Sequence, residues 1–386
     1  MNKRILELQE MMETDKVDAV LYATSGNMQY FLGDDKYFWQ RTTDTGGGKT
    51  AADWHMDGHF LNKPDCCLYV PADGEPALFL THNKYEDMRH IDIGKVPCYF
   101  PMMGSALKNV LKGKKRVACG ESCNRELRRM VLEADSTIET VDAEGYGEKL
   151  RVIKDADELA KLRRAAEFTD CAMGMVVKAL QPGVTPGEVR GLIANIALSH
   201  GTQGLSFDPA AIYVPLGAPV EETFNYPNDA PLKEGTAIGF DFGYVLDGYC
   251  SDYGRSFYCG RNERAKDAYK ALNEAQLYFI DQIKPGKALN MCFDAMYKKL
   301  ENSGFAKYLR RAGDFQIMGH QIGIDVHERP WLRSDEESIF LPGMVMCVEP
   351  KIWWPGVCYL RVEDMVHVTE NGCELLTQFD REYFWL

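Results

Sequence analysis

Two aspartates in the second half of the chain, Asp241 and Asp252, stand on either side of a hairpin signal. The segments that carry them have strand composition, and Asp247-Gly248 between them favours a tight turn. Such a turn pairs Asp241 with Gly254 and places Asp252 two positions along on the same face. A register shifted by two residues places the aspartates directly opposite each other. Both registers bring together two carboxylates, which repel each other unless a cation lies between them. The pair therefore indicates a metal site, with an exposed hairpin face as the alternative.

Three later segments add further groups that can bind a metal or move a proton. Two histidines, His320 and His327, lie in a segment that we expect to be a loop bounded by glycines. Glu349 is the one carboxylate of an apolar strand, and Arg361 and Glu363 share one face of another strand by two-residue periodicity. A lone buried glutamate is usually salt-bridged in a core. Several together are harder to explain in that way, because a buried carboxylate is costly without a cation or metal.

Short motifs that contain these residues occur in a fixed order along the second half of the chain. They are Asp241-Phe-Gly, Ser251-Asp252-Tyr-Gly-Arg255, Gly319-His320-Gln-Ile-Gly, Val326-His327-Glu328, Glu349-Pro350 and Arg361-Val-Glu363-Asp. Their order and separations resemble the pita-bread metallopeptidase family of methionine aminopeptidase, aminopeptidase P, prolidase and creatinase, with a pattern closest to Xaa-Pro dipeptidase. The first half resembles, less specifically, the N-terminal domain of creatinase and prolidase.

The resemblance implies a dinuclear metal centre. Asp241 would bind one ion, Asp252 and Glu363 would bridge two, and His320 and Glu349 would complete one coordination shell. One imidazole with four carboxylates suits manganese, with cobalt, iron or zinc as alternatives. Two such ions about 3.5–4 Å apart can lower the pKa of a bridging water and polarise a carbonyl, so that the resulting hydroxide cleaves a short peptide.

The resemblance also implies roles for the side chains around the ions. Glu349 would accept the proton of the attacking water, and His327 would hydrogen-bond the substrate carbonyl or the tetrahedral intermediate. Arg361 would orient the carboxylates and contact the substrate. Relatives with this pair of domains favour Xaa-Pro bonds, so we expect a peptidase of the Xaa-Pro dipeptidase or aminopeptidase type.

Two departures from the family pattern put the substrate in doubt. The family has a histidine shortly before the first metal aspartate, whereas this chain has Phe224 or Asn225 there, depending on a gap. Asn225 can donate a hydrogen bond to a substrate but cannot transfer a proton at neutral pH. Gly254 stands where a threonine is common, and His200 and His367 fit structural roles. An enzyme of the same fold that acts on a small polar metabolite, as a C–N hydrolase or lyase, is therefore one alternative, and a non-catalytic binding protein is another.

Local sequence signals predict an architecture of two domains that positions these groups. Residues 1–153 form an α/β domain, with a helix over 3–14, strands near 19–22, 67–70 and 77–80, and an insertion near 34–64. Residues 154–386 form an α+β domain with two similar halves, because a helix, a Pro-Gly break, a second helix and strands occur twice. The family resemblance implies that this is the pita-bread domain with its pseudo-twofold halves. Its helices run over about 156–180, from a cap at Thr185 with Pro186 and Glu188, over 263–283 and over 290–301.

The insertion carries residues whose function the sequence leaves open. Its Gly46-Gly-Gly-Lys-Thr50 lacks the earlier glycine of a phosphate-binding loop, where Thr43 stands, so we reject that motif. The segment 53–59 could bind metal or contact substrate or a partner. Since the family resemblance implies a homodimer whose N-terminal domain borders the other subunit's cleft, we hypothesise that four side chains reach that neighbouring site. These are Trp39, Trp54, His55 and His59.

Composition excludes several function classes. A net charge of −13 argues against nucleic acid as a partner, because phosphate binding requires clusters of Lys and Arg. The sequence has no apolar run long enough to span a bilayer and no signal-peptide pattern at its start. Its 12 cysteines are scattered without a CxxC pair, which favours reduced, buried thiols. These features predict a cytoplasmic protein with a peptide or small polar substrate.

Overall fold

The computed structural model describes residues 2–36, 66–81, 89–98, 103–120, 125–218, 227–310 and 317–386. The predicted insertion lies almost entirely outside the described residues, as do Phe224 and Asn225. The chain divides into two compact units, Met1–Arg151 and Val152–Leu386. Among the described residues, no helix is both long and apolar enough to cross a membrane.

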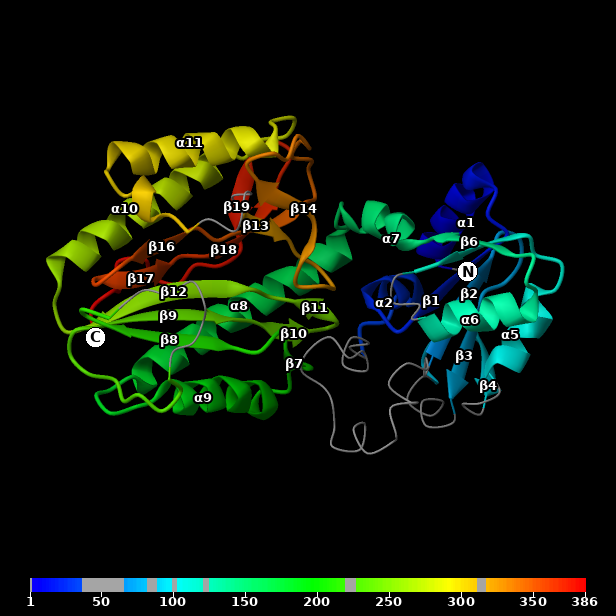
Figure 1. The fold of residues 1–386 in the computed structure, drawn as a ribbon, viewed down its shortest axis with the longest axis horizontal. Helices are drawn as coiled ribbons and strands as arrows, with labels where there is room; N and C mark the ends of the chain where they lie inside the picture. The colour runs from blue at the N-terminus through cyan, green and yellow to red at the C-terminus, as the bar shows by residue number, and fades with distance from the viewer. Residues whose placement is uncertain are drawn as a thin grey trace. The chain divides into compact units, whose positions relative to one another are not determined.

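The N-terminal unit is built on a six-stranded mixed sheet with the order β4-β3-β2-β1-β5-β6 (Figure 1). Strands β1, β2 and β3 pair antiparallel, while β1/β5, β5/β6 and β3/β4 pair parallel. The strands are β1 (Ala19–Ala23), β2 (Cys66–Pro71), β3 (Ala77–Thr81), β4 (Gly94–Cys98), β5 (Arg116–Cys119) and β6 (Glu139–Asp142). The helices are α1 (Lys3–Asp15), α2 (Gly26–Leu32), α5 (Met103–Leu111), α6 (Arg125–Ala134) and α7 (Glu144–Arg151). The predicted first helix and first three strands are confirmed.

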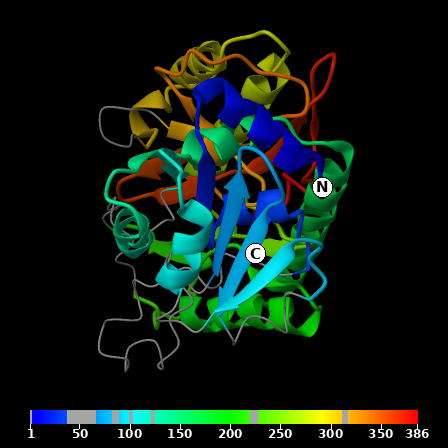
Figure 2. The ribbon, with the colours of Figure 1, turned by 90° about the vertical axis from the view of Figure 1, so that its right-hand side faces the viewer.

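Helices cover both faces of this sheet, as Figures 1 and 2 show. On one face, Leu21 of β1 packs in a core with Leu107 of α5 and Leu127 of α6. On the other face, the ring of Tyr22 stacks on Phe31 of α2 with a centroid separation of 5.2 Å. Because neighbouring strand residues point to opposite faces, β1 is buried on both sides, as expected for a strand inside a helix-flanked sheet.

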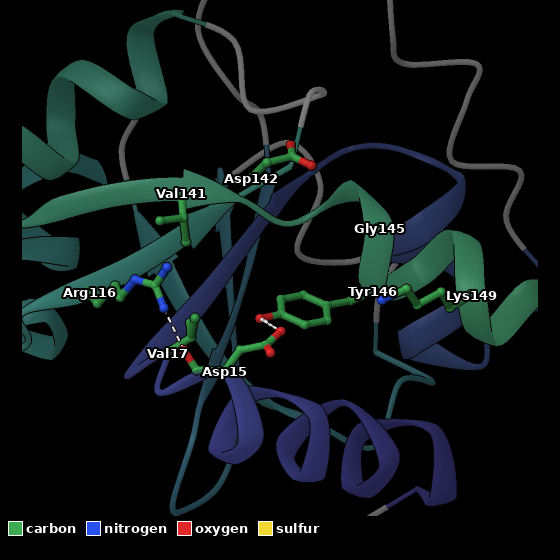
Figure 3. A pocket seen from close by; sticks show the side chains of 8 residues that line it. All are labelled: Asp15, Val17, Arg116, Val141, Asp142, Gly145, Tyr146 and Lys149. Atoms are coloured by element: carbon green, nitrogen blue, oxygen red, sulfur yellow. Dashed lines mark hydrogen bonds between the residues drawn. The ribbon is translucent and has the colours of Figure 1, made fainter.

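The N-terminal unit also carries a pocket beside the end of α1 (Figure 3). The Tyr146 hydroxyl donates to Asp15 Oδ2 at 2.9 Å inside it. This contact and burial raise the pKa of Tyr146 to about 12, with burial as the larger cause. The pocket contains none of the predicted site residues. Its lining is Asp15, Val17, Arg116, Val141, Asp142, Gly145, Tyr146 and Lys149.

The C-terminal unit has two helix pairs, each followed by strands, as the repeated order in the sequence predicts. Helices α8 and α9 lie against strands β8, β9 and β12, and α10 and α11 lie on the side of β16 and β17 (Figure 1). The helices are α8 (Ala156–Ala179), α9 (Pro186–Ser199), α10 (Glu263–Gln282) and α11 (Leu289–Asn302). Thr185 caps α9, and Glu188 closes a capping box with it, as predicted.

The strands of this unit form several small sheets, with the orders β11-β10-β7, β12-β9-β8, β14-β13-β15-β18-β19 and β16-β17. In the first half they are β7 (Gly204–Leu205), β8 (Ala210–Pro215), β9 (Thr236–Phe242), β10 (Tyr244–Leu246), β11 (Tyr249–Cys250) and β12 (Tyr253–Cys259). In the second half they are β13 (Ile317–Gln321), β14 (Glu328–Arg333), β15 (Val345–Val348), β16 (Lys351–Trp354), β17 (Cys358–Arg361), β18 (Asp364–Val368) and β19 (Cys373–Leu375).

Strand β9 separates two cores and so fixes the direction of its aspartate. Ile238 and Phe240 pack in the core with α8 and α9, whereas Ala237 packs in the core with α10 and α11. Gly239 lies so close to β17 that a Cβ there would be 2.5 Å from the Tyr359 ring. By alternation Asp241 shares the face of Gly239 and points toward β17.

The cysteines match the prediction of reduced thiols. All described cysteines are free, and all except Cys171 and Cys373 are buried.

Candidate metal centre

The hairpin around Asp247-Gly248 has the predicted register. Both turn residues have positive φ, 50° and 77°, which is the conformation that a tight two-residue turn requires. Asp241 pairs with Gly254 across β9 and β12, so the first of the two registers is confirmed. Asp252 directly precedes β12 and its side chain is 3% exposed, against 20% for Asp241. The hairpin therefore brings one fully buried carboxylate beside one that is partly accessible.

His320 lies inside a strand, not in a loop as predicted. It is the fourth residue of β13 and pairs with Cys347 on β15. The glycine signals misled the prediction: Gly319 has φ of 148°, and a Cβ there would lie 1.9 Å from the Cys347 carbonyl oxygen. Gly319 thus allows close strand pairing and does not mark a loop. His327, by contrast, does lie in the connection between β13 and β14.

The imidazole of His320 has a defined tautomer. Its Nδ1 lies 3.0 Å from the backbone oxygen of Gln321, and since a carbonyl only accepts, Nδ1 carries the proton. Nε2 therefore presents its lone pair, 3.4 Å from Asp252 Oδ2 and 4.0 Å from Glu349 Oε1. This is the arrangement found when a histidine binds a metal through one nitrogen and is oriented through the other.

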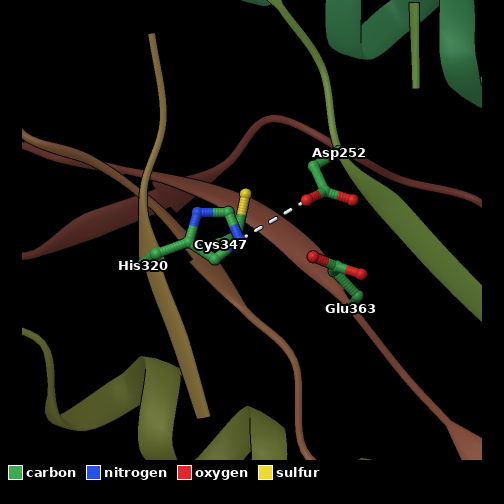
Figure 4. Close-up of side chains that lie close together, drawn as sticks. All are labelled: Asp252, His320, Cys347 and Glu363. Carbon is green, nitrogen blue, oxygen red and sulfur yellow. Dashed lines mark ion pairs between the residues drawn. The ribbon is translucent and has the colours of Figure 1, made fainter. Parts of the chain in front are cut away.

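Glu363 occupies a break between two strands that the sequence predicted as one. Strand β17 ends at Arg361 and β18 begins at Asp364. Between them the Glu363 amide donates to the Gly254 oxygen at 2.9 Å, an isolated bridge to β12. Up to Arg361 the chain pairs with β16, and at Glu363 it pairs with β12. Local periodicity in the sequence could not predict this change of partner strand. The change of partner places the Glu363 carboxylate, fully buried, beside Asp252 (Figure 4).

Several buried polar atoms of these residues face one another without a hydrogen-bond partner among the described residues. They are Asp241 Oδ1, Asp252 Oδ1, His320 Nε2 and Glu363 Oε1. Burial raises the pKa of Asp252 well above its usual range, and the Asp241 carboxylate raises it further. Burial also raises the pKa of Glu363, against the Arg361 guanidinium, which lowers it. A divalent cation would bind the unpaired acceptor atoms and would stabilise the ionised form of these buried carboxylates. The residues present therefore fit a metal centre.

Arg361 is a cation that lies among these carboxylates. Its Nε donates to Glu363 Oε2 at 2.9 Å, its Nη2 to Glu349 Oε2 at 2.8 Å and its Nη1 to Asp241 Oδ2. Gly254 makes room for it, because a Cβ there would lie 2.6 Å from Arg361 Nε. All three guanidinium nitrogens are engaged by carboxylates, which supports the predicted orienting role. A direct contact with substrate stays a prediction.

Asp364, the residue after Glu363, belongs to a separate buried network. Its oxygens accept from Arg255 Nη2 at 2.7 Å, from the Thr377 hydroxyl at 2.8 Å and from Arg381 Nη2. Arg255 and Asp364 are both completely buried. The two adjacent acidic residues thus differ in role. Glu363 faces the other carboxylates, whereas Asp364 is neutralised by arginines of the protein.

Two residues beside Glu349 were missed by the sequence prediction. The ammonium group of Lys351 donates a hydrogen bond to Glu349 Oε2. Burial alone would raise the pKa of the Glu349 carboxyl, but Lys351 and Arg361 outweigh it and hold that pKa well below its usual range. Cys347 lies close to Asp252, His320 and Glu363, and the four side chains together could hold a metal ion. Burial raises the pKa of its thiol, and the Asp252 carboxylate raises it further. Their spacing, two residues on either side of Glu349 in an extended segment, was a usable signal that they share its face.

His327 lies over the site next to His320. The two rings meet edge to face with a centroid separation of 4.4 Å, and His327 stacks on Trp331 at 5.3 Å. Burial and the neighbouring His320 lower the pKa of His327 to about 4, so the ring is neutral at physiological pH. The following residue, Glu328, forms a buried ion pair with Lys154 at 2.8 Å. A neutral imidazole is thus anchored where it can donate a hydrogen bond.

The remaining predicted histidines have structural partners. His200 ends α9, and its Nδ1 lies 3.0 Å from the Ile196 oxygen. His367 lies on β18, with Nδ1 2.6 Å from Glu374 Oε1. Asn225, Phe224 and the four side chains of the insertion fall outside the described residues, so their predicted roles are untested.

Comparison with known proteins identifies the family. The model of metallopeptidase family M24 matches residues 160–370, more than half of the chain and nearly all of the candidate site. The chain belongs to metallopeptidase family M24. The predicted pita-bread metallopeptidase resemblance is thereby confirmed, and the chain is a metallohydrolase.

Individual relatives agree with this M24 assignment. An uncharacterized peptidase of Staphylococcus saprophyticus is 26% identical over 98% of this chain and 100% of its own length. YkvY of Bacillus subtilis, provisionally named a dipeptidase, is 32% identical over 63% of this chain and 65% of its own length. The prolidase from Pyrococcus horikoshii superposes with a TM-score of 0.83 at 21% identity, covering 99% of this chain and 100% of that one. Its full-length match confirms the predicted fold class of an α/β domain followed by a pita-bread domain.

Proposed function

We propose that this M24 protein is a dinuclear metal-dependent peptidase that cleaves short peptides with an Xaa-Pro bond. The observation that carries the proposal is the convergence of Asp241, Asp252, His320, Glu349 and Glu363, with orphaned buried acceptors, in a chain of the metallopeptidase family. Four carboxylates and one imidazole are hard ligands, which favours manganese, with cobalt, iron or zinc as alternatives.

Two bound ions would lower the pKa of a water between them and polarise the scissile carbonyl. The chain's own residues prepare that chemistry. Glu349 stays ionised beside Lys351 and Arg361, so that its carboxylate is available to bind metal. The family resemblance assigns it the further role of accepting the proton of the attacking water. His327 stays neutral because burial and His320 lower its pKa, so that a ring N–H is available to the substrate carbonyl or tetrahedral intermediate. Arg361 holds Asp241, Glu349 and Glu363 in one arrangement.

The substrate class rests on likeness in fold. Solved structures similar over the whole chain include a prolidase and an Xaa-Pro dipeptidase, and both domains of those proteins have counterparts here. We propose the domain limits 1–153 and 154–386, with the second carrying the chemistry and the insertion near 34–64 shaping the substrate range.

A second candidate function is a reaction of the same metals on a small polar metabolite, as a C–N hydrolase or lyase. One observation favours it. The sequence has Phe224 or Asn225 where the family has a histidine, and neither side chain can transfer a proton at neutral pH. The peptidase remains the leading proposal because the chain belongs to a metallopeptidase family and a prolidase is among its structural neighbours.

The test strips the purified protein with chelator, reloads it with manganese and counts metal per chain. The reloaded protein is assayed on Xaa-Pro dipeptides, matched Xaa-Ala dipeptides, tripeptides and small amides, with Glu349→Ala as the control. About two ions per chain and Xaa-Pro cleavage that the variant loses would support the peptidase. Bound metal with every peptide intact would favour the second candidate, and a chain that takes up no divalent ion would contradict both.

We also propose that the protein is a cytoplasmic homodimer in which the insertion reaches the partner's site through Trp39, Trp54, His55 and His59. Family resemblance supports the dimer, and the scattered cysteines without a CxxC pair, which favour reduced thiols, support the compartment. Deletion of residues 40–60 should then change substrate range while the metal count stays the same. Unchanged kinetics and unchanged sedimentation of the deletion variant would contradict the proposed reach.

A further inference from the structure

Cys347 shares the face of the proposed metal ligands. It pairs with His320 across β13 and β15, and Glu349 follows it by two residues along the same chain segment. Cross-strand partners lie side by side on one face of a sheet, and so do residues two apart in a strand. The backbone register therefore directs the Cys347 side chain toward the same space as the His320 ring and the Glu349 carboxylate.

The side chains confirm this direction. The Cys347 sulfur, a His320 nitrogen and one carboxylate oxygen each of Asp252 and Glu363 all lie within 4.8 Å of one another (Figure 4). All four residues are completely or almost completely buried. Ligand atoms around one ion at about 2.0–2.3 Å lie roughly 3–4.5 Å apart, so only small rotations would bring these four onto a common centre.

A second observation points to a ligand at this place. His320 Nε2, Asp252 Oδ1 and Glu363 Oε1 have no hydrogen-bond partner among the described residues, although each is buried. The three residues that carry these orphaned atoms are the ones grouped with Cys347. A thiol in a group of buried, unsatisfied carboxylates is otherwise an unfavourable neighbour for them, since it is only a weak donor.

We propose that the Cys347 sulfur is a direct ligand of the ion that His320 binds. This rests on the proposed function, and it makes the two metal positions chemically different. On binding, the thiol proton leaves to solvent and a metal–sulfur bond forms. The position at His320 and Cys347 then has nitrogen, sulfur and oxygen ligands, which suit zinc, cobalt or iron, while the position at Asp241 has oxygen ligands that suit manganese.

The experiment reloads chelator-stripped protein with cobalt(II) and records its absorption spectrum. The wild-type protein should take up two ions per chain, and one of them should give a near-ultraviolet thiolate-to-cobalt charge-transfer band. Cys347→Ser should lose this band and bind zinc at least about tenfold more weakly, while its manganese affinity changes little. Cys292→Ala, at a buried thiol on α11 in the core, is the matched control and should keep the band.

X-ray absorption of the wild-type protein loaded with zinc gives a second readout that needs no variant. A sulfur neighbour at about 2.3 Å is expected. Two bound ions with only nitrogen and oxygen neighbours, and a cobalt spectrum that Cys347→Ser leaves unchanged, would overturn the role of Cys347 and leave the proposed function standing. A wild-type protein that binds manganese but neither cobalt nor zinc would overturn the role of Cys347 alone, and one that binds no divalent ion would overturn both.

Discussion

The ammonium group of Lys351 donates a hydrogen bond to the Oε2 atom of Glu349, and the same oxygen accepts a second hydrogen bond from Arg361. One proposed metal ligand is therefore already paired with two cations of the protein. An arriving divalent ion must share or replace these partners, because like charges at such short range repel strongly in a buried site. We therefore expect Lys351 to weaken metal binding at this centre.

Replacement of Lys351 by Met should tighten metal binding. Without the ammonium, Glu349 offers its full charge to the ion, and we expect manganese to bind about tenfold more tightly at pH 8, equivalent to about 1.4 kcal/mol. Calorimetric titration of stripped protein measures this. Lys270→Met, at an exposed position of α10, should change nothing. A weaker or unaltered manganese affinity in Lys351→Met would show that the ammonium does not compete.

Replacement of Asp252 by Asn should have opposite effects with and without metal. The pKa of Asp252 in the folded chain is raised by burial and by Asp241. Its contribution to stability is therefore fully present below its unfolded pKa and is lost as pH rises through the raised folded pKa. In chelator, Asp252→Asn should be the more stable protein by about 1 kcal/mol or more at pH 8, with the gap closing toward pH 4. Urea unfolding across this pH range measures the gap.

With manganese present the wild type should be more stable than Asp252→Asn. The bound ion stabilises the wild type, whereas the variant lacks one of the ligands that would hold it. A gap in chelator that does not vary with pH would contradict a raised pKa for this carboxyl.

The buried pair of Lys154 and Glu328 should support the loop that carries His327. Lys154→Met removes the ammonium beside a carboxylate that is 6% exposed, and we expect a loss of about 3–5 kcal/mol in the free energy of unfolding. Adding Glu328→Gln should restore most of it, because the amide oxygen can still accept from the Asp325 amide. Urea unfolding and kcat of the two proteins are compared.

Lys299→Met removes an exposed partner of Glu274 and is the matched control, with an expected change of at most about 1 kcal/mol. If Lys154→Met costs no more than this surface variant, the pair does not hold the loop.

A side chain at position 254 should disturb the centre through Arg361. The Cβ of Gly254→Ala would lie 2.6 Å from Arg361 Nε and 2.8 Å from its Cδ, so the guanidinium must leave Glu363 and Asp241. We expect about 10–100-fold lower metal affinity or activity. Gly191→Ala, at an exposed site in α9 with open space around it, should be neutral or slightly stabilising. Equal metal affinity in Gly254→Ala and the wild type would mean that Arg361 does not organise the carboxylates.

Local sequence signals predicted those parts of the site that local chemistry decides. The turn at Asp247-Gly248 fixed the pairing of Asp241 with Gly254, because a two-residue turn leaves one register. Caps and Pro-Gly breaks located the helices of the C-terminal unit to within a residue or two. The identity of the ligand residues came from the order of the motifs, and their roles remain predictions.

Long-range pairing decided what the sequence could not show. Glu363 points to Asp252 because the chain changes partner from β16 to β12, and residues far apart in sequence determine that change. His320 is held in a strand by β15, although the glycines around it suggested a loop. The sequence does not single out Lys351 and Cys347, because each is an ordinary strand residue until Glu349 is known to face the other carboxylates.

The network around Asp364 has a consequence for how the enzyme matures. Arg255, Arg381 and Thr377 satisfy this aspartate with protein groups alone, directly behind the residues that would bind the ions. The structure that supports the proposed metal ligands can therefore form before any ion binds. We expect the nascent chain to fold first and to acquire its metals afterwards from the cellular supply, so that growth conditions decide which ions a preparation contains.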